Sequence, residues 1–147
     1  MVIDDKDTKI LKHLLIDARQ SSRQLAHRLG VSTVTMISRL RKLEEKKIIQ
    51  GYSVRLDHEL LGYEITAIIE IKTTKGKMLE IENKIAKQDN VIAVYDITGD
   101  TDTIVIAKFK DRRSLSIFVK NLSAIPNVET TVTHIVLNTV KEDDRLI

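Results

Sequence analysis

The sequence of 147 residues contains no cysteine and no tryptophan, and it has a single proline. Without cysteine, the chain can form neither disulfide bonds nor thiolate metal sites. The four histidines, His13, His27, His58 and His134, lack the close spacing of metal ligands, so we expect no metal site and no cofactor. All apolar runs are far shorter than the about 18 residues that a membrane span needs, and no membrane partner is expected.

The motifs of common enzyme classes are also missing from the sequence. There is no Ser-His-Asp set and no Gly-rich phosphate loop, and the carboxylates and histidines are dispersed along the chain. We therefore expect no catalysis. Residues 1–10 are acidic and lack the apolar core of a signal peptide, so a cytoplasmic location is expected.

The charged residues are unevenly distributed along the chain. Residues 1–57 hold 12 Lys and Arg against 7 Asp and Glu, a net charge of +5, whereas residues 58–147 have a net charge of −2. A basic module beside a nearly neutral one is the electrostatic pattern of a nucleic-acid-binding domain with a partner domain.

Residues 21–49 have the pattern of a DNA-binding helix-turn-helix. Ser21 and Gln24 have the spacing of a capping box, which begins a helix. Gly30 suits the left-handed residue that often follows a helix end. Ser32 can then cap a second, longer helix.

The second helix, expected over residues 33–46, has an apolar stripe formed by Met36, Leu40 and Leu43. The other faces carry side chains that can contact phosphates or base edges, namely Ser32, Thr33, Thr35, Ser38, Arg39, Arg41 and Lys42. Arg39 is the leading candidate for a base contact, because an arginine can bind guanine through two hydrogen bonds. The hydroxyl residues are interpreted as phosphate or mixed contacts. A solvated helix face is the alternative interpretation, and the uneven charge makes DNA contact the preferred one.

The predicted fold class is α+β. A first helix over residues 4–18 completes an N-terminal three-helix, winged-type helix-turn-helix domain over 1–50. Alternating apolar residues over 48–56 predict a strand, so the linker over 51–62 is expected to be a strand linker. The domain over 63–147 shows the βαββαβ order of a ferredoxin-like fold. Its strands are expected over 65–71, 91–98, 103–109 and 128–140, and its helices over 76–87 and 114–122.

Two features of this second domain concern function. Helices cover one face of such a sheet, and the open face needs a cover, most simply a second copy of the chain, so dimerisation is expected.

Gly99, Asp100, Thr101 and Asp102 form a turn signal between the middle strands. One interpretation is a plain hairpin turn. In the other, a carboxylate of Asp100 or Asp102 accepts from an ammonium group, while backbone N–H groups and Thr101 bind a carboxylate.

A helix-turn-helix, a linker and a βαββαβ domain, in that order, resemble the Lrp/AsnC family of feast/famine transcription regulators. The resemblance covers nearly the whole chain. It rests on several segments in the right order: residues 4–11, 17–19, 29–32, 39–44, 48–52, 99–102 and 130–141.

This resemblance implies an effector-sensing transcription regulator that dimerises through the second domain, with dimers assembling into tetramers or octamers. Small effectors, usually amino acids, would bind between dimers near the turn over residues 99–102. The two helix-turn-helix units of a dimer would bind a pseudo-palindromic site on double-stranded DNA.

The sequence departs from the family pattern in places. Lys47 stands where the family often has glycine, and the aromatic residue common near Thr101 is missing. Val34 and Ile37 occupy positions that are usually polar and outward. Either the helix is rotated, or these side chains meet thymine methyl groups or a neighbouring surface.

Two other functional classes are compatible with these patterns. One is an architectural, chromatin-like DNA-binding protein that needs no effector. The other is an interaction module whose helix-turn-helix contacts only protein. Phosphate contacts strengthen as the salt concentration falls. A regulator should therefore bind DNA at low salt, whereas the interaction module should not.

Overall fold

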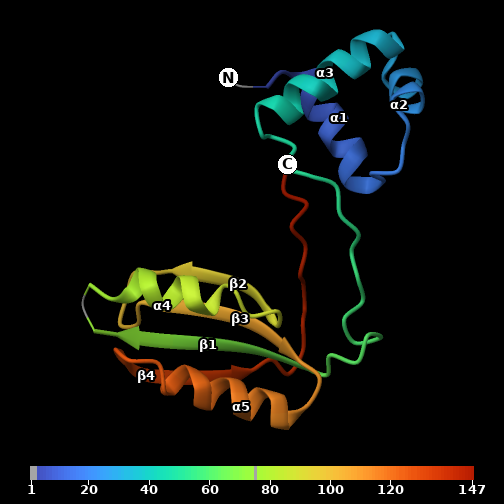
Figure 1. Cartoon of the computed structure of the whole chain (residues 1–147). Coiled ribbons are helices and arrows are strands. Elements are labelled where there is room, and N and C mark those ends of the chain that lie inside the picture. The colour runs from blue at the N-terminus through green and yellow to red at the C-terminus, as the bar shows by residue number, and fades with distance from the viewer. Residues whose placement is uncertain (1–2, 75) are drawn as a thin grey trace. The chain divides into compact units, whose positions relative to one another are not determined.

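The computed structural model describes residues 3–74 and 76–147, which form two compact units (Figure 1). The helical unit comprises the described residues up to Arg55 together with the tail Lys141–Ile147, and the sheet unit comprises Leu56–Val140. The tail, expected within the second domain, instead groups with the helical unit. Arg55 accounts for part of this, because its Nη2 donates to the carbonyl oxygen of Glu142 at 3.1 Å and its Nη1 lies 3.7 Å from Asp143.

The described part of the helical unit contains the three predicted helices, α1 (Asp5–Ile16), α2 (Ser22–Leu29) and α3 (Thr33–Glu45). Ser21 caps α2 as expected: its Oγ accepts from the backbone N–H of Gln24 at 3.2 Å, and Gln24 Oε1 accepts from the N–H of Ser21 at 2.8 Å. Gly30 ends α2 in the left-handed conformation, with φ of +63°. The local capping signals therefore define where these helices begin and end.

Lys47 takes the left-handed conformation, with φ of +57°, at the end of α3. The N–H of Lys47 donates to the carbonyl of Glu44, and the N–H of Ile48 donates to the carbonyl of Leu43, both at 2.9 Å. These two bonds form a Schellman motif. The helix end thus has the shape that glycine commonly supplies, although a lysine stands there.

The three helices enclose a small apolar core of Ile10, Leu25, Ala26, Met36 and Leu43, each at most 2% exposed. Met36 and Leu43 belong to the predicted stripe of α3, and Leu40 packs against the same core. This packing fixes the rotation of α3 about its own axis.

The expected strand over residues 48–56, and with it the strand linker and the wing, is wrong. Residues 51–57 have no regular secondary structure, and no strand lies between α3 and residue 65 in the described chain. The alternating side chains of Tyr52, Val54 and Leu56 are 53%, 78% and 56% exposed. Alternation predicts a strand only where a neighbouring strand supplies hydrogen bonds, and none of the four described strands pairs with this segment.

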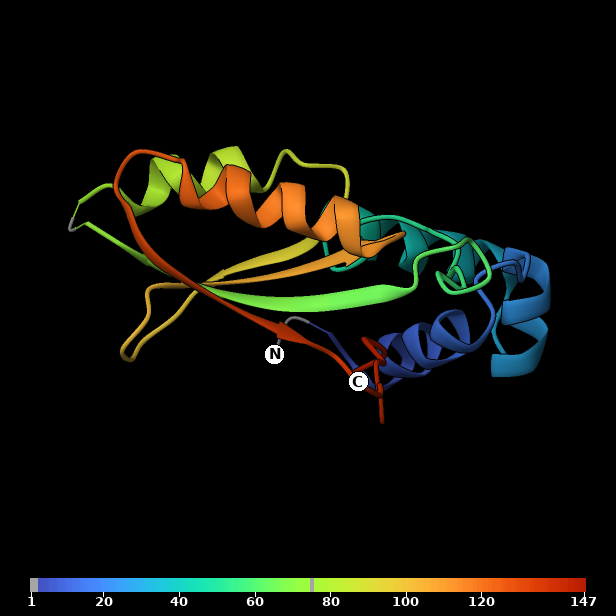
Figure 2. The same ribbon diagram turned by 90° about the horizontal axis from the view of Figure 1, so that it is seen from below.

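The sheet unit has the predicted βαββαβ order. Its described elements are β1 (Ile65–Thr73), α4 (Met78–Ile85), β2 (Val91–Asp96), β3 (Thr103–Phe109), α5 (Arg112–Ser123) and β4 (Val128–Ile135). The strands form an antiparallel sheet in the order β2-β3-β1-β4. Figure 2 shows α4 and α5 on the same face of this sheet. Strand β4 ends at Ile135, before the expected residue 140, and the N–H of Val136 still donates to the carbonyl of Thr66 at 2.9 Å.

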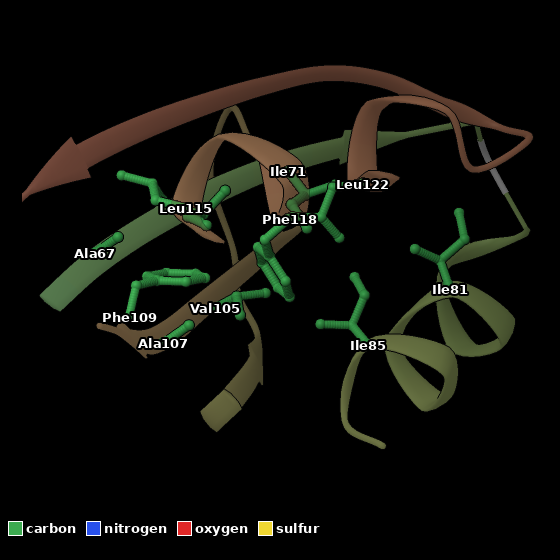
Figure 3. Packing of buried hydrophobic residues seen from close by; sticks show 11 residues of the cluster. Ala67, Ile71, Ile81, Ile85, Val105, Ala107, Phe109, Leu115, Phe118 and Leu122 are labelled. Atoms are coloured by element: carbon green, nitrogen blue, oxygen red, sulfur yellow. The ribbon is translucent and has the colours of Figure 1, made fainter. Parts of the chain in front are cut away.

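Strict alternation along β1 and β3 builds the core under the helices. Ala67, Ile69 and Ile71 of β1 are fully buried, as is Val105 of β3. The rings of Phe109 and Phe118 meet edge to face with centroids 5.2 Å apart, which joins the sheet to α5. Figure 3 shows these side chains packed between the strands and both helices.

The opposite face of the sheet is not covered by the helices. Ile68 pairs with Ile106, and Ile104 pairs with Tyr95, so apolar side chains meet across three strands. Tyr95 is 54% exposed, and Val132 on β4 is 48% exposed. The same face carries Glu70, which is paired with His134 at 3.0 Å, so the sheet unit presents a mixed surface with an apolar part that a single chain leaves open to solvent.

Candidate functional site

The outer face of α3 carries most of the residues predicted to contact DNA. Ser32, at the helix start, has its Oγ 3.1 Å from the backbone N–H of Thr35, from which it accepts, and 2.8 Å from Thr35 Oγ1. Thr33, Ser38, Arg41 and Lys42 are exposed. Six of the seven predicted residues, Ser32, Thr33, Thr35, Ser38, Arg41 and Lys42, thus lie together on the solvent side of one helix.

Val34 and Ile37 also face outward, with 78% and 49% of their surface exposed. Since Met36 and Leu43 of the same helix are 0% and 2% exposed, the helix has the predicted rotation. A rotated helix therefore does not explain these two apolar side chains. Both side chains are open to solvent in the single chain.

Arg39, predicted to contact a base, is paired with two carboxylates of the same chain. Its Nη1 donates to Asp4 Oδ2 at 2.8 Å and to Asp7 Oδ1 at 2.7 Å, and its side chain is only 25% exposed. The two carboxylates raise the pKa of Arg39 further. The reason lies in its position, three residues after Met36 and four before Leu43, which places it beside the buried stripe. The guanidinium joins α3 to the start of α1.

Asp4 and Asp7 are the residues whose role sequence reasoning missed. Acidic residues at the start of a helix commonly do no more than interact favourably with the helix dipole. In the structure they form the capping box of α1 and also hold Arg39. The backbone N–H of Asp7, followed by the side chain of Arg39, holds the pKa of Asp4 below its usual 3.8. An arginine next to a buried stripe is the signal that could have revealed an acidic partner.

Tyr52 makes a second contact that the sequence did not indicate. Its hydroxyl donates to Glu44 Oε1 at 3.0 Å, so the first residues of the linker are tied to α3. Burial, and then the hydrogen bond to Glu44, raises the pKa of this hydroxyl.

The turn over residues 99–102 joins β2 to β3, and its two carboxylates have different surroundings. Asp102 Oδ2 accepts from the N–H of Thr73 at 2.7 Å and from its hydroxyl at 3.2 Å. Asp102 therefore fixes the turn to the end of β1. Asp100 is exposed beside Gly99, and Thr101 is half-buried. Of the two candidates for an ammonium group, Asp100 is the one whose carboxylate faces solvent.

The described residues offer neither a metal site nor a membrane span. In that part of the chain no cluster of three His, Asp or Glu side chains is placed to hold a metal ion. None of the helices described is both long enough and apolar enough to cross a membrane.

Two family models match the chain. Residues 3–44 match the AsnC-type helix-turn-helix domain, and residues 66–146 match the Lrp/AsnC ligand binding domain. The first match contains α1, α2 and nearly all of α3, and the second contains nearly all of the sheet.

The chain is similar, over nearly its whole length, to proteins that are named transcriptional regulators. An uncharacterized HTH-type transcriptional regulator of Pyrococcus furiosus is 49% identical, covering 99% of both chains. The HTH-type transcriptional regulator FL11 of Pyrococcus horikoshii is 36% identical, covering 98% of this chain and 95% of its own. The structure of a Neisseria meningitidis transcriptional regulator in complex with L-Met has a TM-score of 0.90 at 27% identity, covering 99% of this chain and 96% of that one.

The cluster of Asp4, Asp7 and Arg39 predicts a specific dependence of stability on pH. Since the pKa of Asp4 in the folded protein lies below its usual 3.8, ionised Asp4 stabilises the fold above that value. The stabilisation is lost as the pH falls through the lowered pKa. Asp4→Asn keeps a side-chain acceptor at the helix cap but cannot titrate. Thermal melts from about pH 6 to about pH 3 should therefore show the wild type losing its advantage over Asp4→Asn. A difference that stays constant over this range would contradict the role given to Asp4.

Proposed function

The chain belongs to the Lrp/AsnC family of helix-turn-helix transcriptional regulators, and from this premise we propose that it binds specific DNA sites in the cytoplasm in response to an amino-acid effector. The main support is the outer face of α3. It combines a capped N-terminus with exposed hydroxyl and basic side chains, on the half of the chain whose net charge is +5. Such a helix fits the major groove of DNA.

Different residues of α3 take different parts in this proposal. Ser32, Thr33 and Thr35 lie at the helix N-terminus, where hydroxyl and backbone N–H groups suit phosphate oxygens. Ser38, Arg41 and Lys42 extend the contact along the exposed face. We leave Arg39 out of this set, because its Nη1 donates to both Asp4 and Asp7. We assign it a positioning role.

A second copy of the chain is the proposed cover for the open face of the sheet. The apolar side chains of Ile68, Ile104 and Ile106 have cross-strand partners but no covering helix. Packing two such faces together removes this surface from water and creates a two-fold symmetric dimer. A symmetric dimer presents two α3 helices, which suits a pseudo-palindromic DNA site. Tetramers or octamers built from these dimers are part of the same proposal.

The proposed effector site includes the turn of Gly99, Asp100, Thr101 and Asp102. The exposed carboxylate of Asp100 suits the ammonium group of an amino acid. Asp102 keeps the turn in place through Thr73, and backbone N–H groups of the turn suit the effector's carboxylate. The Neisseria meningitidis relative, whose structure is a complex with L-Met, supports the amino-acid class.

Lys42→Ala tests the proposed phosphate contact. Losing one such contact should weaken binding to all duplexes alike and reduce the slope of log affinity against log salt by about 1. Lys87→Ala, an exposed lysine of the sheet unit, is the matched control and should change neither quantity. Fluorescence anisotropy over a salt series measures both. An unchanged slope in Lys42→Ala would contradict the contact, and no binding at low salt even by the wild type would favour an interaction module.

The effector proposal predicts heat on titration of the protein with amino acids, one at a time, with and without DNA. At least one amino acid should bind, and Asp100→Asn should weaken that binding about ten-fold or more, because a charge-assisted hydrogen bond is lost. Asp89→Asn, an exposed aspartate in another loop, is the control. The absence of heat with every amino acid would instead favour an architectural DNA-binding protein. Full affinity in Asp100→Asn would place the ammonium group elsewhere.

A further inference from the structure

The most exposed apolar side chains of α3 lie where the helix would enter the DNA. Val34 and Ile37 are the second and fifth residues of the helix, so they are close to one turn apart on its N-terminal half. They are 78% and 49% exposed, although both residues are large and apolar. Helix propensity does not explain their presence either, because β-branched residues are mediocre helix formers.

We propose that Val34 and Ile37 determine the DNA specificity of this protein by contacting the C5-methyl groups of thymines in the major groove. The preferred half-site would then carry thymines, in A·T pairs, at the positions that face these two residues. This inference rests on the proposed DNA-binding function and adds to it the base that α3 recognises.

The chemistry of the major groove favours this partner. Among the four bases only thymine presents a methyl group there, while the other groups are hydrogen-bond donors and acceptors. The N-terminal residues of a recognition helix are those that contact base edges. An apolar side chain stabilises the complex there when it and the apolar group of a base are removed from water together.

Hollows lie on both sides of the outer face of α3. Val34 borders a hollow of about 530 Å³ that Ser38 and Lys42 line together with Asp4 and Asp7. Ile37 borders a hollow of about 440 Å³ that Arg41 and Glu44 also line. Of these neighbours, the hydroxyl and basic groups are the ones that suit phosphates.

The environment of Arg39 makes this arginine a weaker competitor for guanine on α3. A free arginine would favour guanine. Here the guanidinium donates to two carboxylates, at 2.8 and 2.7 Å, and the three groups together carry a net negative charge. The DNA-facing surface of the N-terminal half of α3 is thus apolar at its centre, which favours A·T over G·C pairs.

A protein partner could in principle cover the same two side chains. The charge of the surroundings favours DNA instead, because Arg41 and Lys42 flank the apolar pair and residues 1–57 have a net charge of +5. A duplex with its dense phosphates is the complementary partner for such a surface.

The test begins with the full-length protein and a high-affinity duplex selected from random sequences. Each thymine of that duplex is then replaced singly by deoxyuridine, which removes only the C5-methyl group. At the positions that face Val34 and Ile37, we expect affinity to fall about four-fold per methyl group lost. Replacements elsewhere in the site should have little effect.

Variants then assign each methyl group to a side chain. Val34→Ala should bind thymine and uracil equally at one position in each half-site, and Ile37→Ala should do so at another. Val54→Ala is the matched control, because Val54 is also 78% exposed but lies outside α3, and it should keep full discrimination. Circular dichroism melts verify that each variant is folded.

The outcomes separate this inference from the function on which it rests. If the protein selects a specific duplex but tolerates uracil at every position, thymine recognition is wrong and sequence-specific binding stands. If discrimination persists in both Val34→Ala and Ile37→Ala, the assignment to these residues is wrong. If no duplex is selected from the random pool, the proposed function fails and the inference fails with it.

Discussion

The guanidinium of Arg39 lies between the carboxylates of Asp4 and Asp7, and this cluster determines what α3 can offer to a partner. The contacts, at 2.8 and 2.7 Å, join the recognition helix to the first turn of α1 across more than 30 residues of sequence. The same two carboxylates cap α1. Together with the buried side chains of Met36 and Leu43, the cluster fixes the rotation of α3. Val34, Ser38 and Arg41 are thereby turned outward.

The sheet unit imposes a second constraint, which is that one of its faces lacks a cover in the single chain. Helices α4 and α5 bury the side of the sheet that contains Ile69 and Val105, while the side that contains Ile104 and Tyr95 is left open. A second copy over this face is the proposed solution, and it would make the two α3 helices symmetric. The turn is anchored to β1 by Asp102 and Thr73, so we expect it to move little when an effector binds near Asp100. The effector would instead change how the copies of the chain are arranged relative to one another.

Local patterns predicted most of the fold, and long-range contacts explain the errors. Apolar periodicity and caps such as Ser21 with Gln24 located the helices and strands, because these signals act within a few residues. The strand over 48–56 was wrong because strands depend on a distant partner. The roles of Arg39 and Asp102 were missed for the same reason: their partners lie 32 to 35 and 29 residues away in sequence.

The most direct test of the positioning role of Arg39 is the base preference of Arg39→Met, determined by selection from random duplexes. Methionine keeps a long side chain beside the apolar stripe but cannot bind guanine or carboxylates. If Arg39 only positions α3, the variant should be less stable than the wild type and should bind all duplexes more weakly, while it still prefers the same base at every position of the site. Loss of preference at one base pair, with the others retained, would show that Arg39 contacts that base and would contradict the positioning role.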